Sequence, residues 1–238
     1  MNTFHIMVAG QVAEILSEYR PASSLYADFR TDRPPDFQIT LTDDDLYLDA
    51  VLNGAKKKIE IKTAAILQKM ADALFDYDIL LFHGAVLALH DRAFMFTAPS
   101  RTGKTTHLMK WLDYLPDASV VNGDKPFIKF SDDGRPPLAC GSPWAGKENL
   151  YTNTMVPLKS IILMERAEEN HIEQISFAQA FPFLLQQVYR PDDEEKMRKT
   201  LRLMQRLNPA VSFWRFQCNN FKDDCFDVAY NALVKGQK

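Results

Sequence analysis

The sequence lacks the features that mark several classes of protein. Its 238 residues include only three cysteines, Cys140, Cys218 and Cys225, and no CxxC pair. Neither a zinc site nor a disulfide framework is therefore predicted, and we expect reduced, buried thiols. Residues 1–14 contain no basic stretch followed by a continuous apolar run, so they do not resemble a signal peptide. No apolar run approaches the roughly 18 residues that span a bilayer, and we expect a soluble, cytoplasmic protein with no membrane partner.

Charge and composition narrow the classes further. The net charge of -3 and the pI of about 6.0 argue against a broad surface for nucleic acid. Hydrophobic residues make up 46% and charged residues 25%, which is ordinary for a folded globular chain. No internal repeat, low-complexity tract or linker divides the sequence. We therefore predict a single domain over 1–238, with residues 1–60 as its strand-rich N-terminal part.

Local patterns predict a chain that begins with strands and ends with helices. Apolar and polar residues indicate strands over 4–9, 37–41 and 58–62, with turns at Pro34-Pro35 and Asn53-Gly54. Apolar residues at helical spacing then predict a helix over 64–74. Three apolar runs follow at 79–82, 85–89 and 93–96, and a turn at Asp91-Arg92 would make the last two a hairpin.

The second half continues with alternating elements. A helix from Lys104 to about Leu112 and a buried strand over 119–121 are expected. A strand over 158–163 follows, and residues 172–175 could pair with it. The acidic run 192–195 is best explained as the start of a helix, where it complements the helix dipole. A strand over 214–218 and a closing helix over 226–233 complete the chain.

The segment around residue 100 carries the strongest chemical signal. Residues Ser100-Arg101-Thr102-Gly103-Lys104-Thr105-Thr106 lie between an apolar strand and a predicted helix. Backbone N–H groups of such a loop and the N-terminus of the following helix bind phosphate. Gly103 lets the backbone approach the phosphates, Lys104 can reach the β- and γ-phosphate oxygens, and the Thr105 hydroxyl can ligate Mg²⁺. Thr106 would support the helix start, and the segment predicts an ATP-binding protein.

One position departs from the GxxxxGK[ST] pattern, because Ala98 stands where the first glycine is usual. If that position needs a positive φ, Ala98 would cost on the order of 1 kcal/mol. A GKT triplet also occurs by chance, so an ordinary loop or a degenerate site is the alternative.

Two residues stand where an active site would need them. Asp124 follows the strand over 119–121 and could hold Mg²⁺ or take a proton from the phosphate acceptor. Alone, it would read as a turn aspartate in Asn122-Gly123-Asp124. His83 ends the run 79–82 and, alone, is more simply a structural histidine. Residues 141–149 are either a surface loop or a substrate loop in which Lys147 meets a phosphate and Glu148 meets a metal or the acceptor.

The order of these pieces resembles a known family. Phe82-His83-Gly84-Ala85, then Ser100 to Thr106, then Gly123-Asp124 are similar to the HPr kinase/phosphorylase catalytic domain and its relatives among the phosphoenolpyruvate carboxykinases. The resemblance covers roughly residues 75–165. It implies an α+β fold with a mostly antiparallel or mixed sheet that carries the P-loop, flanked by helices. No match to the carboxykinase oxaloacetate site is present, and the chain is most similar to small stand-alone relatives of the kinase.

The resemblance also implies roles for individual residues. Lys104 and Thr105 match the phosphate and Mg²⁺ ligands, His83 matches the family's histidine, and Asp124 matches one aspartate of an Asp-Asp pair. The other aspartate is absent, because Gly123 and Lys125 flank Asp124. A simple kinase could still use Asp124 as its base, with Mg²⁺ held by Thr105 and ATP oxygens.

Three functions remain open at this point. The first is a kinase that transfers the ATP γ-phosphate to a Ser-type hydroxyl of a peptide, protein or small molecule. The second is a non-catalytic, nucleotide-binding regulatory protein, which Ala98 and the absent aspartate would favour. The third is a GTPase or ATPase switch, for which no second carboxylate on an apolar strand is evident. Relatives are often oligomeric, which leaves a homo-oligomer open.

Overall fold

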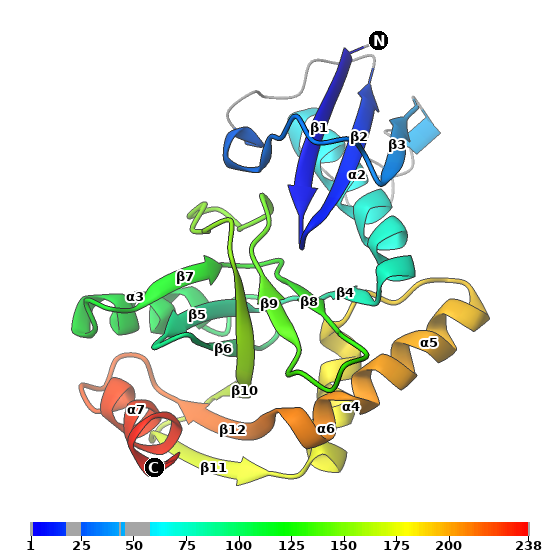
Figure 1. The fold of residues 1–238 in the computed structure, drawn as a ribbon. Coiled ribbons are helices and arrows are strands. Elements are labelled where there is room, and N and C mark those ends of the chain that lie inside the picture. Colours follow the sequence, from blue (N-terminus) through cyan, green and yellow to red (C-terminus); the bar gives the residue numbers. More distant parts are fainter. Residues whose placement is uncertain (1, 18–24, 43, 46–57, 238) are drawn as a thin grey trace.

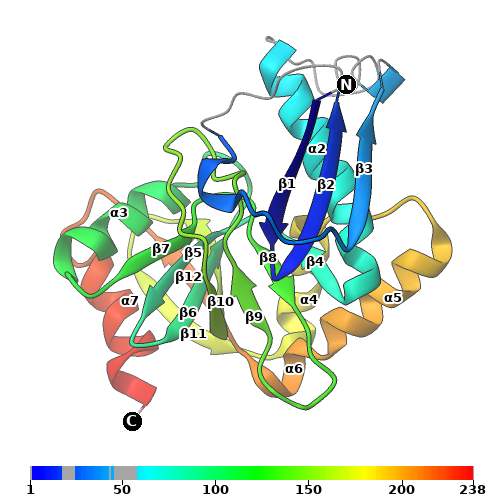
Figure 2. The same ribbon diagram turned by 45° about the horizontal axis from the view of Figure 1, so that its top comes forward.

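The fold was analysed in a computed structural model, which describes residues 2–17, 25–42, 44–45 and 58–237. A small N-terminal sheet has the order β1-β2-β3, formed by β1 (Asn2–Val8), β2 (Gln11–Ser17) and β3 (Phe37–Leu41). Ala9 and Gly10, both with positive φ, make the tight turn between β1 and β2. A short 3-10 helix, η1 (Ala27–Phe29), lies between β2 and β3, and the helix α2 (Lys58–Leu74) packs on this sheet (Figures 1 and 2).

The structure corrects one expectation in this region. Residues 58–62 begin the 17-residue helix α2, so the predicted strand there is wrong. A five-residue alternation is too short to outweigh the helical pattern that continues over 64–74. The predicted turn at Asn53-Gly54 lies outside the described residues.

A large mixed sheet forms the rest of the core. Its main path runs β7 (Ser119–Asn122), β5 (Ala85–Leu89), β6 (Arg92–Thr97), β10 (Met155–Arg166), β12 (Ser212–Cys218) and β11 (His171–Ile175). The N-terminal end of β10 also pairs with β9 (Leu138–Cys140), which continues through β8 (Phe127–Lys129) to β4 (Ile79–Leu81). The strand β10 therefore joins two sheet regions, as Figure 1 shows. The mixed sheet and its helices confirm the predicted α+β class.

Helices bury both faces of the central strands. The helices α3 (Lys104–Tyr114) and α7 (Cys225–Leu233) pack on one face, where Trp111 and Phe226 meet Leu87 and Phe96. The helices α4 (Phe177–Gln187), α5 (Glu194–Gln205) and α6 (Leu207–Ala210) pack on the other. Burial on both faces explains why β5 and β6 are continuous apolar runs. Two short 3-10 helices, η2 (Phe75–Tyr77) and η3 (Lys235–Gln237), follow α2 and α7.

The directions of the strands bring distant segments to one edge. The strands β6, β10 and β12 are parallel, so their carboxyl ends lie at the same edge of the sheet. Because β5 is antiparallel to β6, the amino end of β5 lies there too. The strand β7 is antiparallel to β5 and therefore ends at this edge. Residues near 83, 98, 124, 166 and 218 are thereby gathered, which is where open α/β sheets bind ligands.

Most of the other predicted elements are present. The hairpin over 85–96 is confirmed, with His90 and Asp91 as its two turn residues of positive φ. Asp193 caps α5 by accepting a hydrogen bond from the Lys196 N–H, which confirms the role expected for the acidic run. The predicted pairing of 172–175 with 158–163 is wrong, because β12 lies between β11 and β10. The strands β2, β8 and β9 and the helix α4 are not among the elements predicted from the sequence.

The cysteines and the helices bear on two further expectations. All three cysteines are free and buried, as expected. Among the described residues, no helix has the length and apolar character needed to cross a membrane. The single domain remains a prediction.

Gly141 offers a test of the packing at the end of β9. A Cβ atom at Gly141 would lie 1.9 Å from the Thr152 carbonyl oxygen, so a side chain forces the backbone apart. We expect Gly141→Ala to lower the free energy of unfolding by about 3 kcal/mol or more. Gly134→Ala is the control: its Cβ would meet open space, and its positive φ costs about 1 kcal/mol. Equal values for the two variants in urea unfolding would contradict the packing described.

Candidate functional site

The hairpin register places His83 beside the phosphate loop. Ala85 pairs with Phe96, so the residues that precede β5 lie opposite those that follow β6. The Thr97 hydroxyl donates a hydrogen bond to the His83 carbonyl oxygen at 2.7 Å and ties the two segments together. Close packing around Gly84, where a Cβ would lie 3.1 Å from the Phe96 carbonyl oxygen, leaves little room for a side chain there.

The phosphate loop adopts two left-handed residues before α3. Gly103, the N-cap of α3, has φ 109°, and Arg101 has φ 67°. The Thr102 hydroxyl turns back to donate to the Pro99 carbonyl oxygen at 2.8 Å. Ala98 does not adopt a positive φ and is fully buried, so the conformational cost considered for it does not arise. Alanine in place of the usual glycine is thus compatible with this loop.

Lys104 lies at the centre of the loop. Its ammonium donates to the carbonyl oxygens of Ala98 at 2.9 Å and Pro99 at 3.4 Å, and the residue is only 7% exposed. Burial, assisted by Lys125, lowers the pKa of Lys104, while Asp124 opposes that shift. A buried cation held by two backbone carbonyls is well placed to turn toward an anion that enters the loop.

A buried asparagine fixes the turn that carries Asp124. Asn122 Oδ1 accepts from the backbone N–H of Asp124 at 2.8 Å and of Lys125 at 2.6 Å. Asn122 Nδ2 donates to Ser142 Oγ at 2.9 Å and to the Ser142 carbonyl oxygen at 3.0 Å. The Ser142 hydroxyl in turn donates to the Lys125 carbonyl oxygen at 2.7 Å. The Asn122 amide therefore positions Asp124, and both its oxygen and its nitrogen have hydrogen-bond partners.

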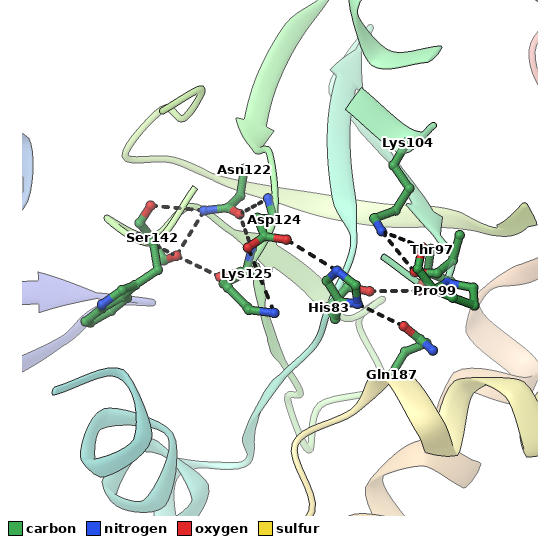
Figure 3. A network of polar contacts seen from close by, with 11 residues as sticks. His83, Thr97, Pro99, Lys104, Asn122, Asp124, Lys125, Ser142 and Gln187 are labelled. Carbon is green, nitrogen blue, oxygen red and sulfur yellow. Dashed lines mark hydrogen bonds and ion pairs between the residues drawn. The ribbon is translucent and has the colours of Figure 1, made fainter. Parts of the chain in front are cut away.

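The His83 ring lies between Asp124 and Gln187 (Figure 3). Its Nε2 lies 3.4 Å from Asp124 Oδ1, and its Nδ1 lies 3.0 Å from Gln187 Oε1. A ring that carries a proton on Nε2 donates to the Asp124 carboxylate and holds it in place.

The charges around Asp124 keep it ionised. Burial would raise the pKa of Asp124, but His83, Lys125 and Lys104 together lower it below its usual value. Lys125 Nζ lies 3.9 Å from Asp124 Oδ2. A lowered pKa means that ionised Asp124 stabilises the fold at neutral pH. That contribution is lost only as the pH falls through the lowered value, below the ordinary aspartate range near 3.9.

These residues line one cleft with a volume of about 850 Å³. All of the residues predicted for the site line this cleft: His83, Ser100, Arg101, Thr102, Gly103, Lys104, Thr105, Thr106, Asp124, Lys147 and Glu148. Lys147 and Glu148 are exposed on its wall and follow Gly146, which packs against Asp124. The Thr105 hydroxyl and the carboxylates of Asp124 and Glu148 are the side-chain oxygens suited to a magnesium ion.

Several lining residues are missed by the sequence analysis. Arg166 ends β10, and its guanidinium donates to the Arg101 carbonyl oxygen. Asn219, Asn220 and Phe221 follow β12 and close the far wall. Asn220 Nδ2 donates to the Gly103 carbonyl oxygen at 3.0 Å. The only sequence signal for them is their place after strands, which gains meaning once β10 and β12 are known to run parallel to β6.

Comparisons with known proteins give a limited result. No protein-family model matches the chain, and no curated protein matches its sequence. Among solved structures, the chain is similar to the Hpr(Ser) kinase/phosphatase from Coxiella burnetii, at 11% sequence identity and a TM-score of 0.39. That match covers 66% of this chain and 99% of the other. The chemistry of this chain is therefore argued from its own side chains.

Removal of the Asn122 amide tests how Asp124 is held. We expect Asn122→Ala to lower the free energy of unfolding by about 2–4 kcal/mol, because it leaves buried N–H groups and the Ser142 carbonyl without their partner. The control Asn153→Ala removes an exposed hydrogen bond to Asp28 and should cost under about 1 kcal/mol. Urea unfolding measures both, and an Asn122→Ala protein as stable as the control would show that the network is dispensable.

Proposed function

We propose that this protein is an ATP-dependent kinase that transfers the γ-phosphate to a hydroxyl of a peptide, protein or small molecule. The observation that carries the proposal is the convergence on one cleft of a phosphate loop with its lysine and of an ionised aspartate held by a histidine. Nucleotide binding alone requires only the first of these. The second is the group that a phosphoryl transfer to a hydroxyl needs.

Each wall of the cleft has a role in binding. The backbone N–H groups of the loop and the N-terminus of α3 would receive the β- and γ-phosphates. Lys104 would leave the Ala98 and Pro99 carbonyls for phosphate oxygens. Thr105 would ligate Mg²⁺, which when bound neutralises charge on the phosphates. Phe221, 98% exposed beside the cleft, offers an aromatic face for the base.

The transfer step places Asp124 against the acceptor. The acceptor oxygen forms a bond to the γ-phosphorus as the bond to the β–γ bridging oxygen breaks, and ADP leaves. Asp124 orients the hydroxyl and receives its proton. Because the transition state of such transfers is loose, a weakly basic carboxylate suffices, and its position matters more than its proton affinity. His83 keeps Asp124 Oδ1 in place while Oδ2 faces the acceptor.

A non-catalytic regulatory protein is the second candidate. Lys125 stands at one of the two places where the resembling family would have its other aspartate, and its ammonium approaches Asp124 Oδ2. A cation there replaces a metal ligand and could hold Asp124 in a purely structural ion pair. This candidate predicts binding of Mg·ATP without consumption of the γ-phosphate.

Lys104→Ala tests the phosphate site. We expect the affinity for Mg·ATP to fall by about a hundredfold or more, since a buried charge-assisted contact contributes about 3 kcal/mol. Arg135→Ala removes an exposed positive charge that pairs with Asp133 away from the cleft and should leave the affinity unchanged. Isothermal calorimetry compares the variants. Absence of Mg·ATP binding by the wild type would refute the nucleotide site altogether.

Asp124→Asn tests the transfer chemistry. Mg·ATP affinity should stay within a few-fold of wild type, while γ-phosphate transfer falls by about 10²–10⁴-fold. The readout is release of γ-phosphate with and without serine-containing peptides, in the calorimetry samples. Unchanged transfer would remove Asp124 from the mechanism. Binding without turnover by the wild type would favour the regulatory alternative.

A further inference from the structure

A second cluster lies beside the phosphate loop and has no role in the proposed transfer. In the part of the chain that the structure describes, His107, Cys218 and Cys225 are the one group of His, Cys, Asp and Glu side chains close enough to hold a metal ion. The two sulfur atoms lie 3.4 Å apart, and Cys225 Sγ lies 3.4 Å from His107 Nδ1. All three side chains are buried. The cluster could be a metal site or a reactive thiol pair.

A hydrogen bond on the other side of His107 decides between them. Trp111 Nε1 donates to His107 Nε2 at 2.9 Å, and an indole nitrogen can only donate. Nε2 therefore has no proton, and in the neutral ring Nδ1 carries it and directs it at Cys225 Sγ. A metal bound at Nδ1 would move this proton to Nε2, against the Trp111 N–H, with both side chains fully buried. The ring is thus arranged as a donor to sulfur.

The surroundings also distinguish the two sulfurs. The pKa of Cys225 is lowered by the hydrogen bond from Cys218 and by His107 and Lys110, although burial acts in the opposite direction. The pKa of Cys218 is raised by its hydrogen bond to Cys225 and by burial. A proton on His107 Nδ1 directed at Cys225 Sγ favours the thiolate form of Cys225, with the thiol of Cys218 beside it. Cys140, by contrast, is a lone thiol whose pKa burial raises to about 12.

Asn220 connects this pair to the phosphate loop. Its Oδ1 lies 3.3 Å from Cys218 Sγ and 3.4 Å from Cys225 Sγ, so a thiol proton of the pair can be donated to it. Its Nδ2 donates to the Gly103 carbonyl oxygen, and a Cβ at Gly103 would lie 2.5 Å from that nitrogen. Asn220 therefore connects the Cys218 thiol, whose proton its oxygen can accept, to the Gly103 carbonyl of the loop.

We propose that Cys218 and Cys225 are a redox-sensitive pair that a hydroperoxide converts to a disulfide, and that the disulfide releases Asn220 and loosens the phosphate loop. The effect on nucleotide affinity rests on the proposed function, whereas the disulfide does not. A disulfide has no S–H, so Asn220 Oδ1 loses its donor. It also shortens the distance between the sulfurs to about 2.05 Å, which draws the end of β12 toward α7.

The oxidation balances with a hydroperoxide as the oxidant. The thiolate attacks the outer peroxide oxygen, the O–O bond breaks, and a sulfenic acid and an alcohol form, the alcohol taking a proton from solvent. The second sulfur then displaces hydroxide from the sulfenic acid, and its thiol proton leaves with the hydroxide as water. Two thiols and one hydroperoxide thus give one disulfide, one alcohol and one water. Cys218 lines the cleft and covers Cys225, which is fully buried, so the oxidant has to pass Cys218 to reach the thiolate.

Intact mass and thiol titration test the disulfide directly. After hydrogen peroxide treatment we expect the loss of two hydrogen atoms, one remaining thiol at Cys140, and recovery of all thiols with dithiothreitol. Cys218→Ser should gain oxygen at Cys225 without forming the disulfide, Cys225→Ser should gain none because its nucleophile is absent, and Cys140→Ser should still form the disulfide. Three intact thiols after peroxide would overturn the proposal. So would a stoichiometric zinc ion in the purified chain that protects both thiols.

The link to the loop is tested with and without nucleotide. Oxidation should speed amide hydrogen exchange over residues 100–104 and weaken Mg·ATP binding about tenfold, the effect of one lost hydrogen bond. Asn220→Ala should give the weaker affinity in both redox states. If the reduced chain binds no Mg·ATP, the proposed function fails, yet the exchange rates still decide this inference. Identical exchange in the two redox states would show that the pair does not control the loop.

Discussion

The parallel alignment of β6, β10 and β12 is the constraint on which the rest of the molecule depends. Each strand ends at the same edge, and each end supplies a different part of the cleft: the phosphate loop, Arg166 and the Asn219–Phe221 segment. The strand β5 runs the other way and adds His83 before its amino end, whereas β7 runs in the same direction as β6 and adds Asp124 after its carboxyl end. A slip of one residue in any of these ladders would exchange the residues that face the two layers of helices. Core packing therefore sets the geometry of the cleft.

The cleft concentrates charge that its own network partly neutralises. Lys104 and Asp124 are both partly removed from water, a position that would be costly for either alone. Backbone carbonyls hold the lysine, and His83, Lys125 and Lys104 hold the aspartate ionised. An anionic phosphate that displaces the Ala98 and Pro99 carbonyls from Lys104 would exchange two neutral partners for a charged one. The loop is therefore stable as it stands and also disposed toward an anion.

Much of the site could be predicted from local sequence because the hairpin over 85–96 is local. Once that hairpin is inferred, His83 must lie near Ala98, and the phosphate loop follows from the strand, glycine and helix around Gly103. Other parts depend on contacts between distant residues. Nothing near Cys218 in the sequence reveals that β12, and not β11, is the strand that pairs with β10, so Asn220 and Arg166 were beyond prediction. The strand expected over 58–62 failed for a different reason, since five alternating residues fit a helix as well.

Two asparagine amides each connect a segment of the cleft to a neighbouring part of the chain. Asn122 connects the Asp124 turn to Ser142, and Asn220 connects the phosphate loop to the two thiols. An amide can donate and accept at once, so it transmits a change at one end to the other. The partners of Asn122 are backbone groups and a hydroxyl, which keep their protons across the physiological range. The partners of Asn220 are sulfurs, which can lose theirs. The helix α3 carries both Lys104 and His107, one turn apart. Because His107 contacts Cys225, a change at the sulfurs is separated from the phosphate loop by that single turn.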